Sequence, residues 1–393
     1  MSILKKIKFK FSNPKKNKII LFDGESFRDL KYVLEGFNYY MLENRSNRIY
    51  EIYLSINVIF RFILNYFLLF KKNRNLHTLY LVTIINFINP KVIITSICNS
   101  GKFHDLAKLL DKSIFFLAVQ NASRSSDYRR DLHRYEKKIT KRNINKDYYI
   151  PNFYCYGQSE IDDCKKFGVN VINFIKTGSV RIANFFKYVE KNKIKLDKTK
   201  YDLCLISENA YDLNIKLGET MEEQGFANMA KFVIRYAKES NLKFIFARKR
   251  ENFTSQANDE MNFFKKYLST SELNFLKENM NKKKNEYSSY LPLFQSKIAI
   301  GTQSTLLKDK ISCKEKIFSL NLQKTNIYDF PINGVCSIKN CSYNEFKKKL
   351  DQVFLMSNEE YFSNLDKKCD YVIEYNKKEN VIDKIRKSII KNL

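Results

Sequence analysis

KIAIGTQSTLL, residues 297–307, is the stretch of sequence that decides the predicted fold. Lys297–Gly301 is a short, mostly apolar run of the kind that forms a buried strand, and the spacing over Ser304–Ile311 indicates a helix. Ser304 and Thr305 are residue types that begin helices, because their hydroxyls accept hydrogen bonds from unpaired backbone N–H groups. The stretch therefore predicts a strand, a turn and a helix start, which is a place where phosphates bind. A plain helix cap is the alternative interpretation.

The same alternation of apolar runs and helical stretches extends along most of the chain and predicts an α/β fold, with parallel sheets covered by helices on both faces. The predicted strands are Lys18–Phe22, Asn38–Leu42, Val92–Ser96, Ser113–Val119, Phe153–Tyr156, Val171–Ile175, Leu203–Ser207, Lys243–Ala247, Lys297–Gly301 and Lys316–Asn321. The predicted helices are Phe27–Leu34, Ile49–Phe70, Leu76–Ile88, Phe103–Leu110, Ser159–Phe167, Met221–Glu239, Phe263–Tyr267, Ser271–Glu278, Ser289–Phe294, Ser304–Ile311 and much of Tyr343–Asn392.

The length of 393 residues favours two domains, since one hydrophobic core rarely serves so long a chain. Residues 182–199 are rich in Lys and Asn and have no strand pattern, so we place the connection between the domains there. We predict a first domain over residues 1–185, a second over 186–365, and a C-terminal helix over 366–393 that packs back on the first domain.

The formal net charge of +28 would suit a nucleic-acid-binding protein. However, the Lys residues are dispersed, and the abundance of Asn, Ile, Phe and Tyr is what an AT-rich genome produces in any protein. We therefore expect no nucleic-acid partner, while a basic surface still favours anionic ligands. A nucleic-acid-binding protein remains the alternative from another class.

Metal sites and membrane spans are disfavoured by the sequence. The eight Cys form no Cys-x-x-Cys pair and there are three His, so we expect buried thiols in a reducing cytosol, no metal and no cofactor. The apolar segment Ile49–Phe70 contains Arg61 near its middle, which favours an amphipathic helix over a spanning one. Lys71, Lys72 and Arg74 follow it, so a cytoplasmic protein in peripheral contact with the inner membrane is expected.

Further candidate ligand-binding residues follow predicted strands, where parallel sheets bind ligands. Arg248, Lys249 and Arg250 would place three cations at one strand end, which suits a diphosphate. A solvated basic turn is the alternative for them. Gly178, Ser179 and Arg181 follow another strand, with a small residue, a hydroxyl and a cation.

Carboxylates at the end of the first predicted strand are the candidate catalytic residues. Asp23 or Glu25 could remove the proton from an acceptor hydroxyl, while an Asp-Gly turn is the structural alternative.

The order of these motifs resembles that of bacterial surface-carbohydrate biosynthesis proteins of the GT-B fold, which are similar to CDP-glycerol glycerophosphotransferases and to the Kdo transferases of capsule synthesis. The resemblance covers about Ile19 to Asn321. Its carriers are Phe22-Asp23-Gly24-Glu25, Val119-Gln120-Asn121-Ala122-Ser123-Arg124, Tyr156-Gly157, Thr177-Gly178-Ser179-Val180-Arg181, and Ser288-Ser289-Tyr290 followed by Ser296 to Lys316. The departures are Asp309 in place of Glu, Lys314-Glu315-Lys316 in place of Gly-Lys-Lys, and Ala122 in place of Gly.

The resemblance implies two Rossmann-like domains facing a cleft and a metal-independent glycosyltransferase. Its ligands would be a nucleotide-activated sugar donor and a lipid-linked or glycan acceptor of a capsule, lipopolysaccharide or similar surface polymer. It implies phosphate roles for Ser304 and Thr305 and a ribose role for Asp309. Ser289, Tyr290 and Gln303 belong to the same predicted donor site. A CDP-alcohol polyol-phosphate transferase, a non-hydrolysing sugar epimerase and a non-catalytic scaffold are the alternatives.

Overall fold

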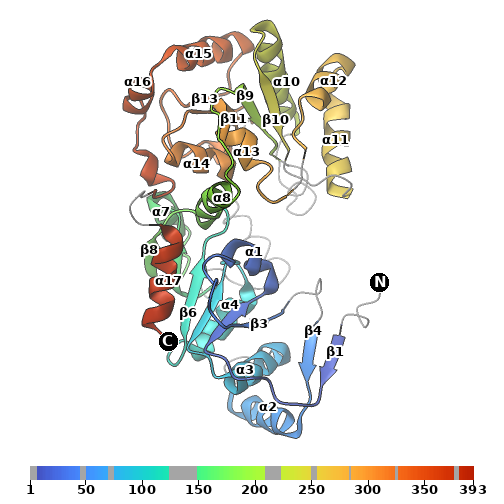
Figure 1. The fold of residues 1–393 in the computed structure, drawn as a ribbon, viewed down its shortest axis with the longest axis vertical. Coiled ribbons are helices and arrows are strands. Elements are labelled where there is room, and N and C mark those ends of the chain that lie inside the picture. The colour runs from blue at the N-terminus through green and yellow to red at the C-terminus, as the bar shows by residue number, and fades with distance from the viewer. Residues whose placement is uncertain are drawn as a thin grey trace. The chain divides into compact units, whose positions relative to one another are not determined.

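The computed structural model describes residues 7–44, 50–69, 75–123, 148–208, 223–248, 255–282, 285–323, 326–375 and 380–393. These residues form two compact units (Figure 1). The first contains the described residues of Met1–Ala122, Glu136–Asn184 and Asn376–Leu393, and the second those of Ser123–Tyr135 and Phe185–Tyr375. The end of the chain therefore returns to the first unit.

The first unit is built on a six-stranded parallel sheet. Its strand order is β3 (Tyr40–Leu42), β2 (Ile19–Phe22), β5 (Val92–Thr95), β6 (Phe115–Val119), β7 (Ile150–Cys155) and β8 (Val171–Lys176). A separate parallel pair joins β1 (Ile7–Lys10) to β4 (Tyr50–Tyr53). The helices are η2 (Gly24–Ser26), α1 (Phe27–Leu30), α2 (Ile56–Leu69), α3 (Leu76–Ile88), α4 (Gly101–Leu110), α7 (Gln158–Lys166) and α17 (Val381–Lys391), while α8 (Val180–Lys191) carries the chain into the second unit.

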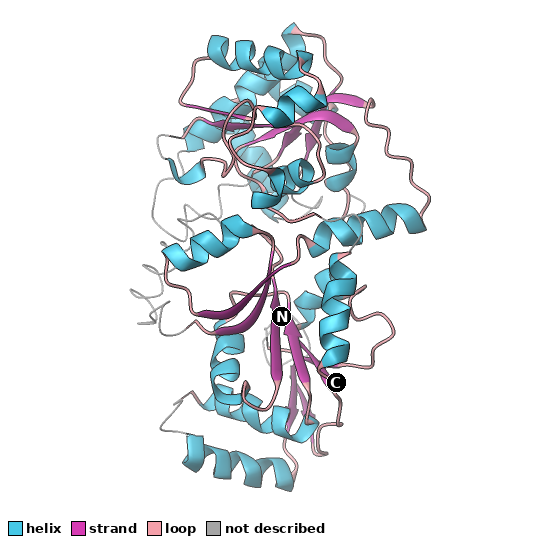
Figure 2. Ribbon diagram, turned by 90° about the vertical axis from the view of Figure 1, so that its left-hand side faces the viewer, coloured by secondary structure: helices cyan, strands magenta, loops and turns pink. Residues whose placement is uncertain are grey.

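Alternate residues of these strands enter two cores, one on each face of the sheet. In β2, Ile20 and Phe22 belong to the core that includes side chains of α3 and α4, whereas Ile19 and Leu21 belong to the core that includes α17. Strands buried on both faces read as continuous apolar runs, which explains why IILF could be recognised in the sequence. Figure 2 shows the strands of each unit between helices.

The second unit contains a five-stranded parallel sheet. Its strand order is β10 (Phe244–Ala247), β9 (Tyr201–Ile206), β11 (Ser296–Gly301), β12 (Ile317–Asn321) and β13 (Ser337–Lys339). The accompanying helices are α10 (Glu223–Glu239), α11 (Ser255–Tyr267), α12 (Thr270–Glu278), α13 (Tyr290–Phe294), α14 (Thr305–Ser312), η3 (Asn326–Tyr328), α15 (Tyr343–Leu355), α16 (Asn358–Ser363) and η4 (Cys369–Tyr371). β11 lies at the centre of this sheet, so the loop after it stands at the middle of the ligand-binding edge.

Several predicted elements were wrong in extent. The predicted helix over Ile49–Phe70 is strand β4 followed by helix α2, with both predicted ends outside the described residues. The predicted helix over Phe27–Leu34 stops at Leu30, and helix α8 occupies the first part of the predicted connection over 182–199. In the described part of the chain, no helix combines the length and apolar character needed to cross a membrane.

Candidate functional site

Three consecutive backbone N–H groups after β11 point at one carboxylate. The amides of Thr302 and Ser304 donate to Oε1 of Glu208 over 2.6 and 3.0 Å, and that of Gln303 donates to Oε2 over 3.3 Å. Glu208 follows the neighbouring strand β9, and the parallel pairing of β9 with β11 brings the two strand ends together. We call this group of amides, Thr302 to Ser304, the anion nest.

The anion nest follows from the local sequence. Helix α14 begins at Thr305, so the preceding amides have no partners within the helix, and the positive end of its dipole lies beside them. Gly301 makes room for an anion, because a Cβ atom at this position would lie 2.5 Å from Oε1 of Glu208. Glycine before a helix start therefore lets a charged oxygen come close to the backbone.

The predicted donor residues Gln303, Ser304 and Thr305 lie at the anion nest. Gln303 and Ser304 contribute amides, and the Ser304 hydroxyl also accepts a bond from the Leu306 amide as the cap of α14. The hydroxyl of Thr305 accepts a bond from the amide of Ser123 over 3.0 Å. The backbone thus supplies the anion contacts at this site, while both hydroxyls hold the loop and helix start in place.

Tyr290 and Asp309 form a buried pair beneath this loop. The Tyr290 hydroxyl donates to Oδ2 of Asp309 over 2.8 Å, and Asp309 is fully buried. Ser289 is also buried, and its hydroxyl donates to the backbone carbonyl of Arg248 over 2.7 Å. These predicted donor residues therefore meet one another in the interior, where they fix α13, α14 and the end of β10.

Arg248 differs from the surface cation that the sequence suggested. It is 6% exposed, and its Nε donates to Oε2 of Glu260 over 2.9 Å. Glu260 is buried too and accepts a bond from the hydroxyl of Ser207, the residue before Glu208. A paired buried arginine holds the loop after β9 instead of offering its charge to solvent. Lys249 and Arg250 lie outside the described residues.

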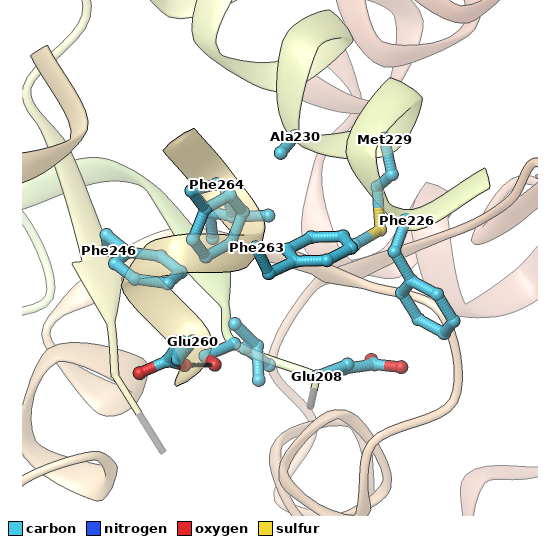
Figure 3. Close-up of a pocket in the computed structure, with 11 residues that line it drawn as sticks. Glu208, Phe226, Met229, Ala230, Phe246, Glu260, Phe263 and Phe264 are labelled. Carbon is cyan, nitrogen blue, oxygen red and sulfur yellow. Dashed lines mark hydrogen bonds between the residues drawn. The ribbon is translucent and has the colours of Figure 1, made fainter. Parts of the chain in front are cut away.

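A pocket with apolar walls adjoins the anion nest (Figure 3). Glu208 lies at its lower edge in Figure 3, with Glu260 on the same side and aromatic rings above. The other lining residues come from β9, β10, α10 and α11: Leu205, Ile206, Ser207, Phe226, Met229, Ala230, Phe246, Phe263 and Phe264. The volume of the pocket is about 20 Å³, room for about one water molecule, so in this structure the aromatic side chains form a packed wall beside Glu208.

The predicted residues of the first unit lie at the ends of β2 and β8. Asp23 is buried with φ at 70°, and its Oδ1 accepts a bond from the Glu25 amide over 3.2 Å. Glu25 itself is exposed. Arg181 forms a two-bond ion pair with the buried Asp29 over 2.8 and 3.2 Å. Of the two candidate carboxylates, only that of Glu25 is exposed.

Gly178 and Ser179 shape the turn from β8 into helix α8. Gly178 has φ at 88°, a value that favours glycine, and the Ser179 hydroxyl accepts a bond from the Ile182 amide over 3.4 Å. Ser179 is buried. Both residues therefore have clear structural roles in this turn.

A hollow of about 220 Å³ lies in the first unit and is lined by residues of β1, β3, β4 and α3 and by Glu43. Its wall includes the tyrosine cluster, which we define as Tyr40, Tyr53 and Tyr80. The Tyr40 hydroxyl donates to that of Tyr53 over 2.9 Å, and burial raises the pKa of all three phenols. Glu43 also lines the hollow, and its Oε2 accepts a bond from the Gly24 amide. The bond between Gly24 and Glu43 thus links the wall of the hollow to the loop after β2.

Within the described ranges, no group of three or more His, Cys, Asp or Glu side chains is placed to hold a metal ion.

Solved structures provide the relevant comparisons, since no protein-family model matches the chain and no curated protein matches its sequence. UDP-GlcNAc 2-epimerase from Methanocaldococcus jannaschii, in complex with UDP-GlcNAc and UDP, has a TM-score of 0.52 at 11% identity, covering 95% of this chain and 99% of that chain. The same enzyme from Neisseria meningitidis, bound to UDP-GlcNAc, has a TM-score of 0.52 at 11% identity, with 95% and 98% covered. The chain has a GT-B-like fold.

A variant of the wall teichoic acid polymerase TagF is also similar, with a TM-score of 0.51, 12% identity, and 96% of this chain and 90% of that chain covered. The predicted fold class is confirmed in its two Rossmann-like parallel-sheet domains and its C-terminal helices. The predicted family resemblance is confirmed only as a distant structural similarity to such enzymes. At these identities the similarity concerns the fold.

Proposed function

We propose that the protein binds a nucleotide-activated sugar at the anion nest and transfers the sugar to a surface glycan or lipid-linked acceptor. The observation that carries this proposal is the convergence of three backbone amides on the carboxylate of Glu208 at the centre of the sheet edge. A phosphate has the same charge sign and the same acceptor oxygens as the carboxylate. In the ligand complex, a donor phosphate would take the place of Glu208.

The chemistry proposed for the nest is stabilisation of the leaving nucleotide. As the bond between sugar and phosphate breaks, negative charge grows on the phosphate oxygens. Amides that are already oriented, together with the dipole of α14, stabilise this charge without reorganisation.

We assign the donor to the second unit and the acceptor to the first. Glu25 is the proposed base, because it is exposed just after β2, whereas the Asp23 carboxylate caps its own turn. It would accept the proton of an acceptor hydroxyl as that oxygen bonds to the sugar. We place the reaction in the cytoplasm.

Nucleotide binding tests the proposal directly. Thermal unfolding is measured with CMP, UDP, CDP and GDP conjugates, and one nucleotide class should raise the melting temperature by mass action. Measured against a reference that already contains inorganic pyrophosphate, the increase caused by the nucleotide should be smaller, because both ligands compete for the nest. If none of these nucleotides stabilises the protein, the proposed function is wrong.

UDP-sugar epimerisation is a second candidate, favoured by the similarity to two UDP-GlcNAc 2-epimerases over nearly their whole length. Proton NMR of UDP-GlcNAc with the protein and no acceptor separates the two functions. An epimerase converts the sugar at its C2 carbon without an acceptor, while a transferase leaves it unchanged until an acceptor is added. A parallel sample with CDP-glycerol tests polyol-phosphate transfer.

A further inference from the structure

Helix α2 presents a continuous apolar stripe to solvent. Its large apolar side chains are 44–86% exposed at positions separated alternately by three residues and one residue. This spacing places them on one face of a helix. They are Ile56, Ile59, Phe60, Ile63, Leu64, Phe67 and Leu68. Single exposed apolar residues are common on proteins, but seven on one face of one helix mark an interaction surface.

The opposite face of α2 is fixed against α3, which lies beside it in Figure 1. Val58 is buried, and the amide of Asn65 donates to the hydroxyl of Thr83 over 2.9 Å in a buried contact. The ring of Phe62 packs edge-on against that of Tyr80. A polar side chain of α2 is thus turned inward while apolar ones face out, which is the reverse of an ordinary surface helix.

We propose that this stripe lies on the surface of an anionic lipid bilayer, with α2 parallel to the membrane plane. At 14 residues the helix is about 21 Å long, too short for the roughly 30 Å apolar core of a bilayer. It contains no acidic residue, and Arg61 is exposed on it. Phenylalanine and leucine on one face with a nearby cation is the pattern of interfacial helices.

Charge favours lipid over a second copy of the chain as the partner. The protein carries a formal charge of +28, which attracts anionic head groups and opposes close approach of two identical chains. The proposal is independent of the nucleotide reaction, because it concerns α2 alone.

The absence of tryptophan from the sequence allows a clean test. Phe67→Trp places the protein's only tryptophan on the stripe, where it can be excited selectively at a wavelength that tyrosine does not absorb. Leu355→Trp places it instead at the end of α15, where the native leucine is 87% exposed. Vesicles of phosphatidylcholine with phosphatidylglycerol should shift the emission of Phe67→Trp to shorter wavelength and leave that of Leu355→Trp unchanged. Emission shifts of both variants, or of neither, would overturn the assigned surface.

Sedimentation with vesicles, for the native chain and for variants without tryptophan, measures how strongly the protein binds to the lipid. Replacing both Phe60 and Phe67 by Asp should weaken partition into anionic vesicles by roughly 100-fold, since two aromatic side chains no longer leave water. Leu355→Asp, which adds an acidic group outside the stripe, should sediment like the native chain. Circular dichroism checks that the variants fold, as expected for exposed positions.

The remaining outcomes count against the proposal. Equal binding to vesicles without phosphatidylglycerol would remove the role of anionic lipid. A native chain that does not sediment with either vesicle overturns the bilayer as partner. If that chain is a dimer in analytical ultracentrifugation and the double variant is a monomer, the stripe covers a second copy instead.

Discussion

Replacing Glu208 by Gln should tighten nucleotide binding, because the Glu208 carboxylate competes for the anion nest. Amide bonds of 2.6, 3.0 and 3.3 Å hold this carboxylate at the site proposed for the donor phosphate. The nucleotide must therefore displace a charged group of the protein before it can bind. The glutamine side chain of the Glu208→Gln variant would keep one neutral oxygen and lose the charge.

The size of the effect follows from the strength of these bonds. A hydrogen bond to a charged acceptor contributes about 1.5–3 kcal/mol and one between neutral groups about 0.5–1.5 kcal/mol. If the substitution removes about 1.5 kcal/mol of internal competition in total, the nucleotide affinity rises about tenfold. The apparent dissociation constant falls because a larger fraction of the protein has an open nest.

Isothermal titration with the nucleotide identified by thermal shift measures this change. Glu278→Gln is the matched control, since Glu278 is exposed in α12 and its replacement alters the net charge equally. A general charge effect would strengthen binding in both variants and fade with added salt. Unchanged or weaker binding to the Glu208→Gln variant would refute the competition. Absence of nucleotide binding in every variant would instead reject the proposed function.

Three further predictions concern stability. Ser304→Ala removes the cap that accepts the Leu306 amide and should cost about 1 kcal/mol in urea unfolding; an unchanged midpoint would show that the cap contributes nothing. Lys310→Met leaves the half-buried Glu315 with one cation fewer and should destabilise the fold by about 3–5 kcal/mol, and a neutral result would contradict the role of this buried pair. Burial raises the pKa of Tyr40, so its neutral phenol contributes stability that is complete below pH 10 and is lost as pH rises through the raised pKa. Unfolding free energies measured from about pH 9 to 12 should fall more steeply for the native chain than for Tyr40→Phe; parallel curves would contradict this.

The sequence allowed prediction of the central strands because their physical signature is local. Parallel strands covered on both faces are apolar along most or all of their length, as in the buried β2 and β10. By contrast, β4 could not be separated from α2, since no glycine or proline stands between Tyr50–Tyr53 and the apolar helix that follows. Its partner β1 lies more than 40 residues earlier in the sequence. The segment is therefore a strand because it pairs with a distant segment, which a local pattern does not reveal.

The same distinction between local patterns and distant pairing applies to the candidate site. A helix start after a glycine predicts free amides from local sequence alone, and the anion nest lies where Gly301 and Ser304 indicated. The position of Glu208 depends on β9 lying beside β11, an arrangement that residues about 95 positions apart do not reveal. The sequence could therefore indicate the donors of the nest but not the carboxylate that they hold.

Arg248 shows why charge alone was a poor guide to the same site. In the sequence it was one of three cations at a strand end, yet its partner Glu260 stands twelve residues later on the next described helix. When Arg248 and Glu260 are buried together, each charge must be compensated by the other. A ligand could therefore bind Arg248 only by breaking this ion pair. Backbone amides are neutral and need no buried counter-ion. The three amides held by the Glu208 carboxylate are therefore stronger grounds for an anionic ligand than the arginine, as the sequence pattern around Gly301–Thr305 had also favoured.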